Sequence, residues 1–146
     1  MKIIKFEEKY RDDLIFMILE AKDALGRVPG LNEDLLDIKK NYVDKGGMSW
    51  IAIDENDRVI GSVGVSMLNN SNECYIHRLF VKCNQKHNGT GTKLLTTAEE
   101  YARKNGKVAT IVHLGKPKEQ WFESWEFYPK NGYVEIEDSI MRKELC

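Results

Sequence analysis

Hydrophobic and polar positions follow two different periods on either side of a glycine-bearing loop. Residues 76–81 alternate and are rich in β-formers, which predicts a strand. Beyond the loop, the apolar positions recur at helical spacing: Leu94, Leu95, Ala98, Tyr101 and Ala102. The pattern therefore predicts a strand that leads into a helix through residues 86–93.

The same two periods divide the rest of the chain into further elements. Strands are predicted over residues 2–6, 49–54, 59–68, 73–81, 108–114, 133–137 and 140–144. Besides the helix that follows the loop and stops at Asn105-Gly106, helices are predicted over residues 12–25, 32–46 and 117–130. Gly61 and Gly64 inside a strand mark either a bulge or a close approach by another part of the chain.

The order of these elements predicts a mixed sheet. Polar turns at 55–58 and 69–72 join three consecutive strands, which should pair antiparallel. A helix connects strand 73–81 to strand 108–114, so these two should run parallel. We expect an α/β (α+β) fold with a mostly antiparallel central sheet, one parallel pair and flanking helices. At 146 residues and 42% hydrophobic content, residues 1–146 should form one domain.

The loop between strand and helix has the features of an anion site. Gly89 and Gly91 carry no side chain that would block a close ligand, and the first turn of a helix offers unpaired N–H groups. Lys86 and Lys93 add positive charge beside them. Phosphate or pyrophosphate is the expected ligand, although Gly-x-Gly at a helix start is also compatible with a plain tight turn.

Charge and composition exclude several other classes. The formal net charge is -1, from 22 basic and 23 acidic residues, which gives no global basic surface for nucleic acid. The chain has no apolar run of membrane-spanning length and no signal-peptide core, so we expect the cytoplasm and no membrane partner. Three cysteines without Cys-x-x-Cys spacing fit reduced thiols, and three histidines without ligand spacing predict no metal.

Two segments, in this order along the chain, resemble motifs of the GCN5-related N-acetyltransferase (GNAT) family. Residues 81–91 read Val-Lys-Cys-Asn-Gln-Lys-His-Asn-Gly-Thr-Gly, similar to the family's acyl-CoA loop Arg/Gln-x-x-Gly-x-Gly/Ala. Cys83 stands where the family usually has Pro, and Lys86 stands in the Arg/Gln position. Residues 127–133 read Phe-Tyr-Pro-Lys-Asn-Gly-Tyr, similar to the family's Phe-Tyr-Glu-Lys-x-Gly-Phe.

The resemblance implies acetyl-CoA as acyl donor and assigns residues to it. The backbone of Leu79, Phe80 and Val81 would pair with the pantetheine amides and polarise the thioester carbonyl. The pyrophosphate would bind the loop, which comprises Lys86, His87, Asn88, Gly89, Thr90, Gly91 and Thr92. Tyr128 occupies the position of the family's acid, which protonates the departing CoA sulfur.

The base is not identified by either motif. An alkyl ammonium has a pKa near ~10.4, so a group or solvent must remove a proton before the nitrogen attacks. Glu73 and His77 lie on one face of strand 73–81 and are the candidates. For each of them the alternative is structural: a solvated carboxylate at the strand end, or a histidine satisfied within the core.

The leading functional hypothesis is N-acyl transfer from acetyl-CoA to a primary amine of a small molecule or peptide. The alternative is a catalytically silent acyl-CoA-binding sensor or module of the same fold. A P-loop nucleotide-binding protein is a distant third class, because Gly-x-x-x-x-Gly-Lys-Ser/Thr is absent.

Two further segments bear on the acceptor side and on assembly. Arg27, in the link 26–30, is a candidate acceptor contact, because the corresponding segment of the resembled family covers the acceptor, whereas Pro29 fits a turn. Trp121, Trp125 and Tyr128 share one helical face, which fits a core face for the tryptophans or a contact in a homodimer.

Overall fold

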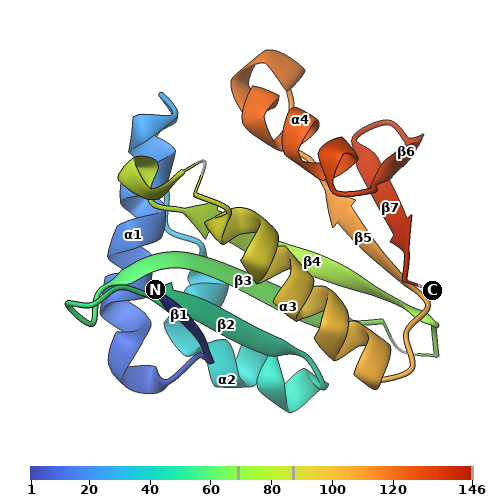
Figure 1. Ribbon diagram of the computed structural model, residues 1–146, viewed down its shortest axis with the longest axis horizontal. Helices are drawn as coiled ribbons and strands as arrows, with labels where there is room; N and C mark the ends of the chain where they lie inside the picture. The colour runs from blue at the N-terminus through green and yellow to red at the C-terminus, as the bar shows by residue number, and fades with distance from the viewer. Residues whose placement is uncertain (69, 87, 146) are drawn as a thin grey trace.

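Seven strands form one mixed sheet in this computed structural model, which describes residues 1–68, 70–86 and 88–145, with only the backbone of Gln120 (Figure 1). The strands are β1 (Lys2–Lys5), β2 (Met48–Ile53), β3 (Val59–Met67), β4 (Glu73–Val81), β5 (Ala109–His113), β6 (Val134–Glu137) and β7 (Ile140–Glu144). Each predicted strand is confirmed to within one residue at either end.

The strand order is β1-β2-β3-β4-β5-β7-β6. All neighbouring strands pair antiparallel except β4 and β5, which are parallel and are connected by a helix. The predicted fold class is therefore confirmed, including the single pair of parallel strands.

Helices cover both faces of the sheet (Figure 1). The α-helices are α1 (Arg11–Ala24), α2 (Ile38–Asn41), α3 (Thr90–Lys104) and α4 (Phe122–Lys130), and the 3-10 turns are η1 (Glu8–Tyr10), η2 (Glu33–Asp37), η3 (Val43–Lys45), η4 (Cys83–Gln85) and η5 (Lys118–Trp121). Alternation along β2 sends Trp50 and Ala52 to the α3 side, and Ile51 and Ile53 to the α1 side. Burying a side chain such as Leu94 contributes about 1.5–3 kcal/mol.

The predicted helix over residues 32–46 is wrong in its continuity, because the segment divides into η2, α2 and η3. Asn32 does not cap it: its Oδ1 accepts a hydrogen bond from Lys22 Nζ at 2.7 Å. The side chain of Asp37 accepts from the Lys40 backbone N–H and starts a new helix in the middle of the segment. Gly46 ends the segment at φ 88°.

Gly61 and Gly64 of β3 lie where other parts of the chain approach closely, which is one of the two interpretations of the sequence. A Cβ at Gly61 would lie 2.8 Å from Leu94 of α3, and one at Gly64 would lie 3.2 Å from the Tyr42 ring. The pairing of β3 with β4 also shifts register between Ser62 and Gly64, so a bulge lies at the same place. Both interpretations are therefore correct here.

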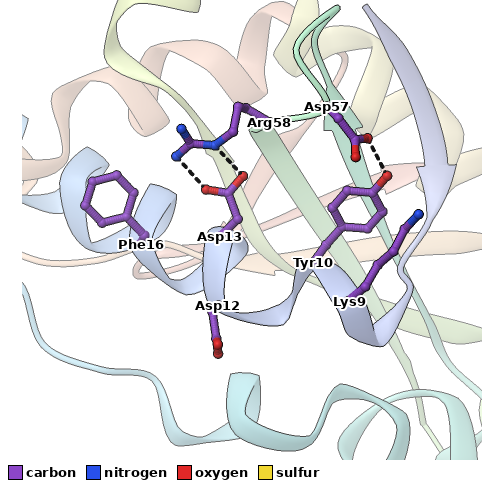
Figure 2. Close-up of a pocket in the computed structure, with 7 residues that line it drawn as sticks. All are labelled: Lys9, Tyr10, Asp12, Asp13, Phe16, Asp57 and Arg58. Atoms are coloured by element: carbon purple, nitrogen blue, oxygen red, sulfur yellow. Dashed lines mark hydrogen bonds and ion pairs between the residues drawn. The ribbon is translucent and has the colours of Figure 1, made fainter.

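The start of α1 is fastened to the turn between β2 and β3, and a surface pocket lies there (Figure 2). Asp13 forms an ion pair with Arg58 at 2.8 Å and accepts the Val59 backbone N–H at 2.8 Å. The Tyr10 hydroxyl donates to Asp57 at 2.6 Å, and this hydrogen bond raises the pKa of Tyr10 to about 12. These groups satisfy one another, and none belongs to the predicted acyl-CoA site.

Candidate functional site

The two parallel strands pair only at their beginnings. Tyr75 opposite Ile111 is the last of three parallel pairs, although β4 continues to Val81. Beyond this point β5 pairs with β7 on its other side, and the two strands diverge (Figure 1). Within the described residues, the β4 edge that faces β5 therefore carries backbone N–H and C=O groups without a strand partner.

A β-bulge lies in β4 where this divergence begins. Ser62 pairs with Phe80 while Gly64 pairs with His77, so β4 contains one extra residue. Arg78 sits there at φ 53°, a left-handed conformation that is uncommon for any residue except glycine. Its guanidinium holds both carboxylate oxygens of Asp34, at 2.9 and 3.1 Å, and its carbonyl accepts from Ser62 Oγ at 2.7 Å.

The glycine loop ends at the uncapped N-terminus of α3. Gly89 is the N-cap at φ 80°, with no side-chain hydrogen bond to the first turn. The backbone N–H groups of Thr90, Gly91 and Thr92 therefore stay available at the positive end of a 15-residue helix. Among the other predicted loop residues, Asn88 is exposed, whereas His87 lies outside the described residues.

Helix α4 contacts this loop from the other side of the divergence. Lys86 Nζ lies 2.6 Å from Glu123 Oε2, which joins the loop to the first turn of α4. A Cβ at Gly91 would lie 3.3 Å from the ring of Phe127. The loop and α4 therefore already touch in the chain alone.

Tyr128 follows Phe127 and is buried, with 8% of its surface exposed. Its ring packs edge-on against Phe127 and Tyr133, at centroid distances of 5.2 and 5.3 Å. Within the described residues its hydroxyl has no hydrogen-bond partner, yet it is not among the fully enclosed orphan atoms. Burial raises the pKa of Tyr128, so its proton is retained through the neutral range.

The two candidate bases have different surroundings. His77 Nε2 lies 2.7 Å from Ser66 Oγ, and burial, followed by the charge of Arg78, lowers the pKa of His77 and keeps the ring neutral. Glu73 lies at the end where β4 and β5 are paired, and its carboxylate forms an ion pair with Arg142 at 2.6 Å. The structure therefore places His77, rather than Glu73, beside the diverging part of the strands.

His113 lies at the end of β5, near the point where the strands diverge, and the sequence analysis did not identify it as a candidate. Because Tyr75 pairs with Ile111 in parallel register, His77 and His113, two residues further along each strand, lie at the same level. The His113 ring packs against Tyr75 at 5.1 Å. The sequence signal was the position of His113 at the carboxyl end of the second parallel strand.

The aromatic face of the last helix is only partly core. Of the three residues predicted to share it, Tyr128 is buried, whereas both tryptophans are partly exposed, which corrects the predicted core role. Trp125 packs on the edge of the core and its Nε1 donates to the Gly115 carbonyl at 3.2 Å. Trp121 stacks instead with the guanidinium of Arg27, whose Cζ lies 3.3 Å from the ring centroid.

In the described part of the chain, no helix is both long and apolar enough to cross a membrane. The same residues contain no group of three or more acidic, histidine or cysteine side chains placed to hold a metal ion.

Several solved structures share this fold over nearly the whole chain. A GNAT-family acetyltransferase from Staphylococcus aureus Mu50 superposes with a TM-score of 0.88 at 23% identity, covering 99% of both chains. The PaiA N-acetyltransferase from Thermoplasma acidophilum, solved in complex with coenzyme A, gives 0.76 at 21% identity over 98% of both chains. An aminoglycoside 6'-N-acetyltransferase from Enterococcus faecium gives 0.72 at 16% identity, covering 100% of this chain and 98% of the other.

A comparison with curated protein sequences gives no significant match. The profile of the Acetyltransferase (GNAT) family, in contrast, matches residues 14–133, from the first helix to the end of the segment that contains Tyr128. This match spans most of the chain and includes the diverging strands, the glycine loop and α4. The chain therefore belongs to the GNAT acetyltransferase family.

Proposed function

We propose that the chain transfers an acetyl group from acetyl-CoA to a primary amine of a small molecule or peptide. One observation supports this proposal: Gly91, in the first turn of α3, lies beside both Val81, at the end of the unpaired part of β4, and Phe127, the neighbour of Tyr128 in α4. Membership of an acetyltransferase family supports the reaction class.

The residues present fit acetyl-CoA. The N–H groups of residues 90–92 and the ammonium of Lys86 match the charge of a pyrophosphate. Open space surrounds the Cβ position of Gly89, so nothing in the described chain obstructs an approach there. Leu79, Phe80 and Val81 belong to the part of β4 beyond its last pair with β5, where pantetheine amides could continue the sheet through the backbone groups that face away from β3. When bound, acetyl-CoA supplies the activated acetyl thioester.

The protein's part in the chemistry is proton transfer. We assign Tyr128 as the acid that donates its phenolic proton to the CoA sulfur, because its raised pKa keeps it protonated and its hydroxyl is not engaged by another described residue. For the base we favour His77, which is neutral at pH 7 and so can accept a proton from the amine. Glu73 is less suited, since Arg142 already engages its carboxylate.

A panel of amines and N-terminal peptides assayed for CoA release tests the proposal directly. Turnover with at least one acceptor, reduced in Tyr128→Phe, is the expected result. Calorimetric titration with acetyl-CoA should accompany the assay, because it distinguishes the silent alternative. Tight binding of acetyl-CoA without turnover of any acceptor would identify a sensor or module and contradict the transfer reaction.

A further inference from the structure

Arg27 holds a charge that the described chain does not neutralise. Its Nε and Nη1 atoms are buried from solvent and have no hydrogen-bond partner among the described residues. Buried donors without partners cost roughly 1–3 kcal/mol each, more when charged, and native proteins contain few of them. Such a group requires an explanation, and a missing hydrogen-bond acceptor is the simplest one.

The guanidinium stacks on a ring that is itself held in place, and the backbone of Arg27 is fixed at the end of α1. The Arg27 backbone N–H donates to the Lys22 carbonyl at 3.1 Å, which fixes the end of α1. The guanidinium carbon lies 3.3 Å from the centroid of the Trp121 ring. That ring in turn lies directly on Gly115, where an added Cβ would come within 2.0 Å of it. A flexible side chain is therefore ordered in advance, with two donors unused.

This position lies at the open end of the diverging strands. Gly115 follows β5 by two residues, and Trp121 ends η5 just before α4. The Arg27–Trp121 contact thus connects the end of α1 to the segment after β5, across the carboxyl ends of β4 and β5. Ligands of parallel strands bind beyond those ends, so an acceptor that reaches the thioester would pass close to Arg27.

The surrounding charges are mostly positive. Lys22 Nζ is held by two neutral oxygens, the Gly30 carbonyl and Asn32 Oδ1, at 2.8 and 2.7 Å. Burial lowers the pKa of Lys22, and the charges of Arg78 and Arg27 lower it further, with Asp34 as the opposing carboxylate. A site with this excess of cations attracts an anion and repels a purely cationic molecule.

Glu123 is the remaining acidic group near Arg27. Its charge opposes the effect of burial on the pKa of Arg27. Its carboxylate, however, is engaged by Lys86 at 2.6 Å and forms no hydrogen bond with Arg27. The donors of Arg27 therefore remain unused even with Glu123 nearby.

We propose that the acceptor amine carries an anionic group, a carboxylate or a phosphate, and that Arg27 binds this group. The inference rests on the proposed acetyl transfer and narrows its substrate class to amino acids, peptides with a nearby carboxylate, or amino phosphates. The stacked guanidinium selects such acceptors over amines of similar size that lack the charge.

Matched amines test the selectivity. β-Alanine is compared with β-alaninamide, and 2-aminoethyl phosphate with ethanolamine, by CoA release at saturating acetyl-CoA. We expect kcat/KM to favour the anionic member of at least one pair by about 10- to 100-fold, the discrimination typical of a charged hydrogen bond. In Arg27→Gln this ratio should fall toward one, whereas Arg27→Lys should retain part of it.

Two controls separate the roles that Arg27 could have. Arg11→Gln removes the same charge from the opposite end of α1 and should leave the ratio unchanged. The KM for acetyl-CoA should also be unchanged in Arg27→Gln. A higher KM for acetyl-CoA with every acceptor would show that Arg27 binds CoA phosphate, and an unchanged acceptor ratio would show no anion recognition. Either result overturns the inference.

Thermal stability gives a readout that does not depend on turnover. Because the two donors are unused, Arg27→Gln should melt at the same temperature as the parent or higher. At least one of β-alanine and 2-aminoethyl phosphate should raise the melting temperature of the parent but not of Arg27→Gln, and β-alaninamide and ethanolamine should raise neither. Absence of this stabilisation overturns the anion site. Absence of turnover with every amine, while the stabilisation persists, contradicts the proposed function alone.

Discussion

Tyr128 is a buried residue whose hydroxyl contributes no hydrogen bond to the described fold. This hydroxyl is not fully enclosed, so solvent or a ligand can reach it, and an accessible donor fits a role in catalysis better than one in packing alone. The neighbouring rings of Phe127 and Tyr133 pack against the Tyr128 ring and hold it in place without a hydrogen bond to its oxygen.

Tyr128→Phe should therefore lower kcat by about 10²- to 10⁴-fold, the usual contribution of general acid catalysis. The melting temperature and the affinity for acetyl-CoA should barely change, because only an unengaged oxygen is removed. Tyr10→Phe is the control, since it removes a hydroxyl that binds Asp57 far from the site and should leave kcat unchanged. Retained turnover in Tyr128→Phe would mean that the proton comes from elsewhere.

As the proposed base, His77 should make the rate of acetyl transfer depend on pH. Its pKa is lowered below the ordinary 6.5, chiefly by burial and then by Arg78, so the neutral base is present above that pH and is lost as the pH falls through the lowered value. The same sign applies to stability: the contribution of neutral His77 is complete above about 6.5 and disappears in acid.

A pH–rate profile of His77→Gln tests this role. We expect kcat/KM to fall by about 10²- to 10⁴-fold and the acidic limb of the profile to disappear. Glu73→Gln should keep that limb, and so should His113→Gln, which removes the other imidazole at the same level of the diverging strands. An acidic limb that persists in His77→Gln would assign the base to solvent or to another group.

The conformations and contacts of some residues of the candidate site could not be predicted from the sequence. The φ of 53° at Arg78 was not predictable because arginine does not favour that conformation, and its contacts with Asp34 and Ser62 come from distant parts of the chain. His113, in contrast, could have been found from the sequence, because it lies at the carboxyl end of the second parallel strand, two residues after the last parallel pair. The stacking of Arg27 on Trp121 joins residues distant along the chain, and no local pattern indicates it.

In the proposed site, Glu123 of α4 would compete with the cofactor pyrophosphate for Lys86. In the chain alone, Glu123 neutralises Lys86 at 2.6 Å, so a bound pyrophosphate would have to replace that carboxylate. The ion pair is partly exposed, with 20% and 51% of the two side chains accessible, and pairs of this kind contribute about 0.2–1 kcal/mol.

Glu123→Gln should therefore tighten acetyl-CoA binding by about 1.5- to 5-fold, because it frees Lys86 and removes a negative charge near the phosphates. Glu126→Gln, an exposed neutral substitution on the same helix, controls for the change in net charge. Titration calorimetry at low salt measures both. Equal affinity in Glu123→Gln and the parent would show that this carboxylate does not oppose the cofactor.

The start of α3 can be tested through its second glycine. Gly91→Val should weaken acetyl-CoA binding, since a branched side chain fills the space beside the first-turn N–H groups. The nearest atoms to its Cβ belong to the end of the Phe127 ring, at 3.3 Å, so the fold can adjust. Circular dichroism should confirm a folded variant before calorimetry. A folded Gly91→Val protein with unchanged affinity would contradict the pyrophosphate assignment.

Elements with strong periodicity were predictable, and those shaped by distant contacts were not. The strands and α1 follow from alternation, helical spacing and glycine stops. The segment over residues 32–46 was predicted as one helix, but Asn32 is used by Lys22 and Asp37 caps a later start. The helix predicted from residue 117 begins as the 3-10 turn η5 and becomes α-helical only at Phe122.

The sheet of this molecule has two parts, which are joined by only a few paired residues. Strands β1 to β4 form one part and β5, β7 and β6 the other, with three parallel pairs between them. Because β4 and β5 pair over so short a length, other contacts must hold the two parts of the sheet together. The Glu73–Arg142 ion pair is one such contact, because it joins β4 to β7.

A buried polar network around Tyr133, whose ring packs against Tyr128, is another such contact. The Tyr133 hydroxyl donates to Glu99 of α3 at 2.9 Å and lies 2.6 Å from the hydroxyl of Thr110 in β5. Glu99 is 3% exposed and also binds Lys143 of β7 at 3.1 Å. This network therefore joins α3, which packs on β3 and β4, to the β5–β7 part of the sheet.

Tyr133→Phe should lower the free energy of unfolding by about 1–3 kcal/mol, because the buried Glu99 carboxylate and the Thr110 hydroxyl each lose a partner. Urea unfolding at pH 7 measures the change, and Tyr128→Phe is the matched control, since that neighbouring hydroxyl has no partner among the described residues. Because the network joins two parts of the sheet, amide exchange in β5 and β7 should accelerate more than in β2 and β3. Equal stability of the two variants, or uniform acceleration of exchange, would show that the network does not hold the parts together.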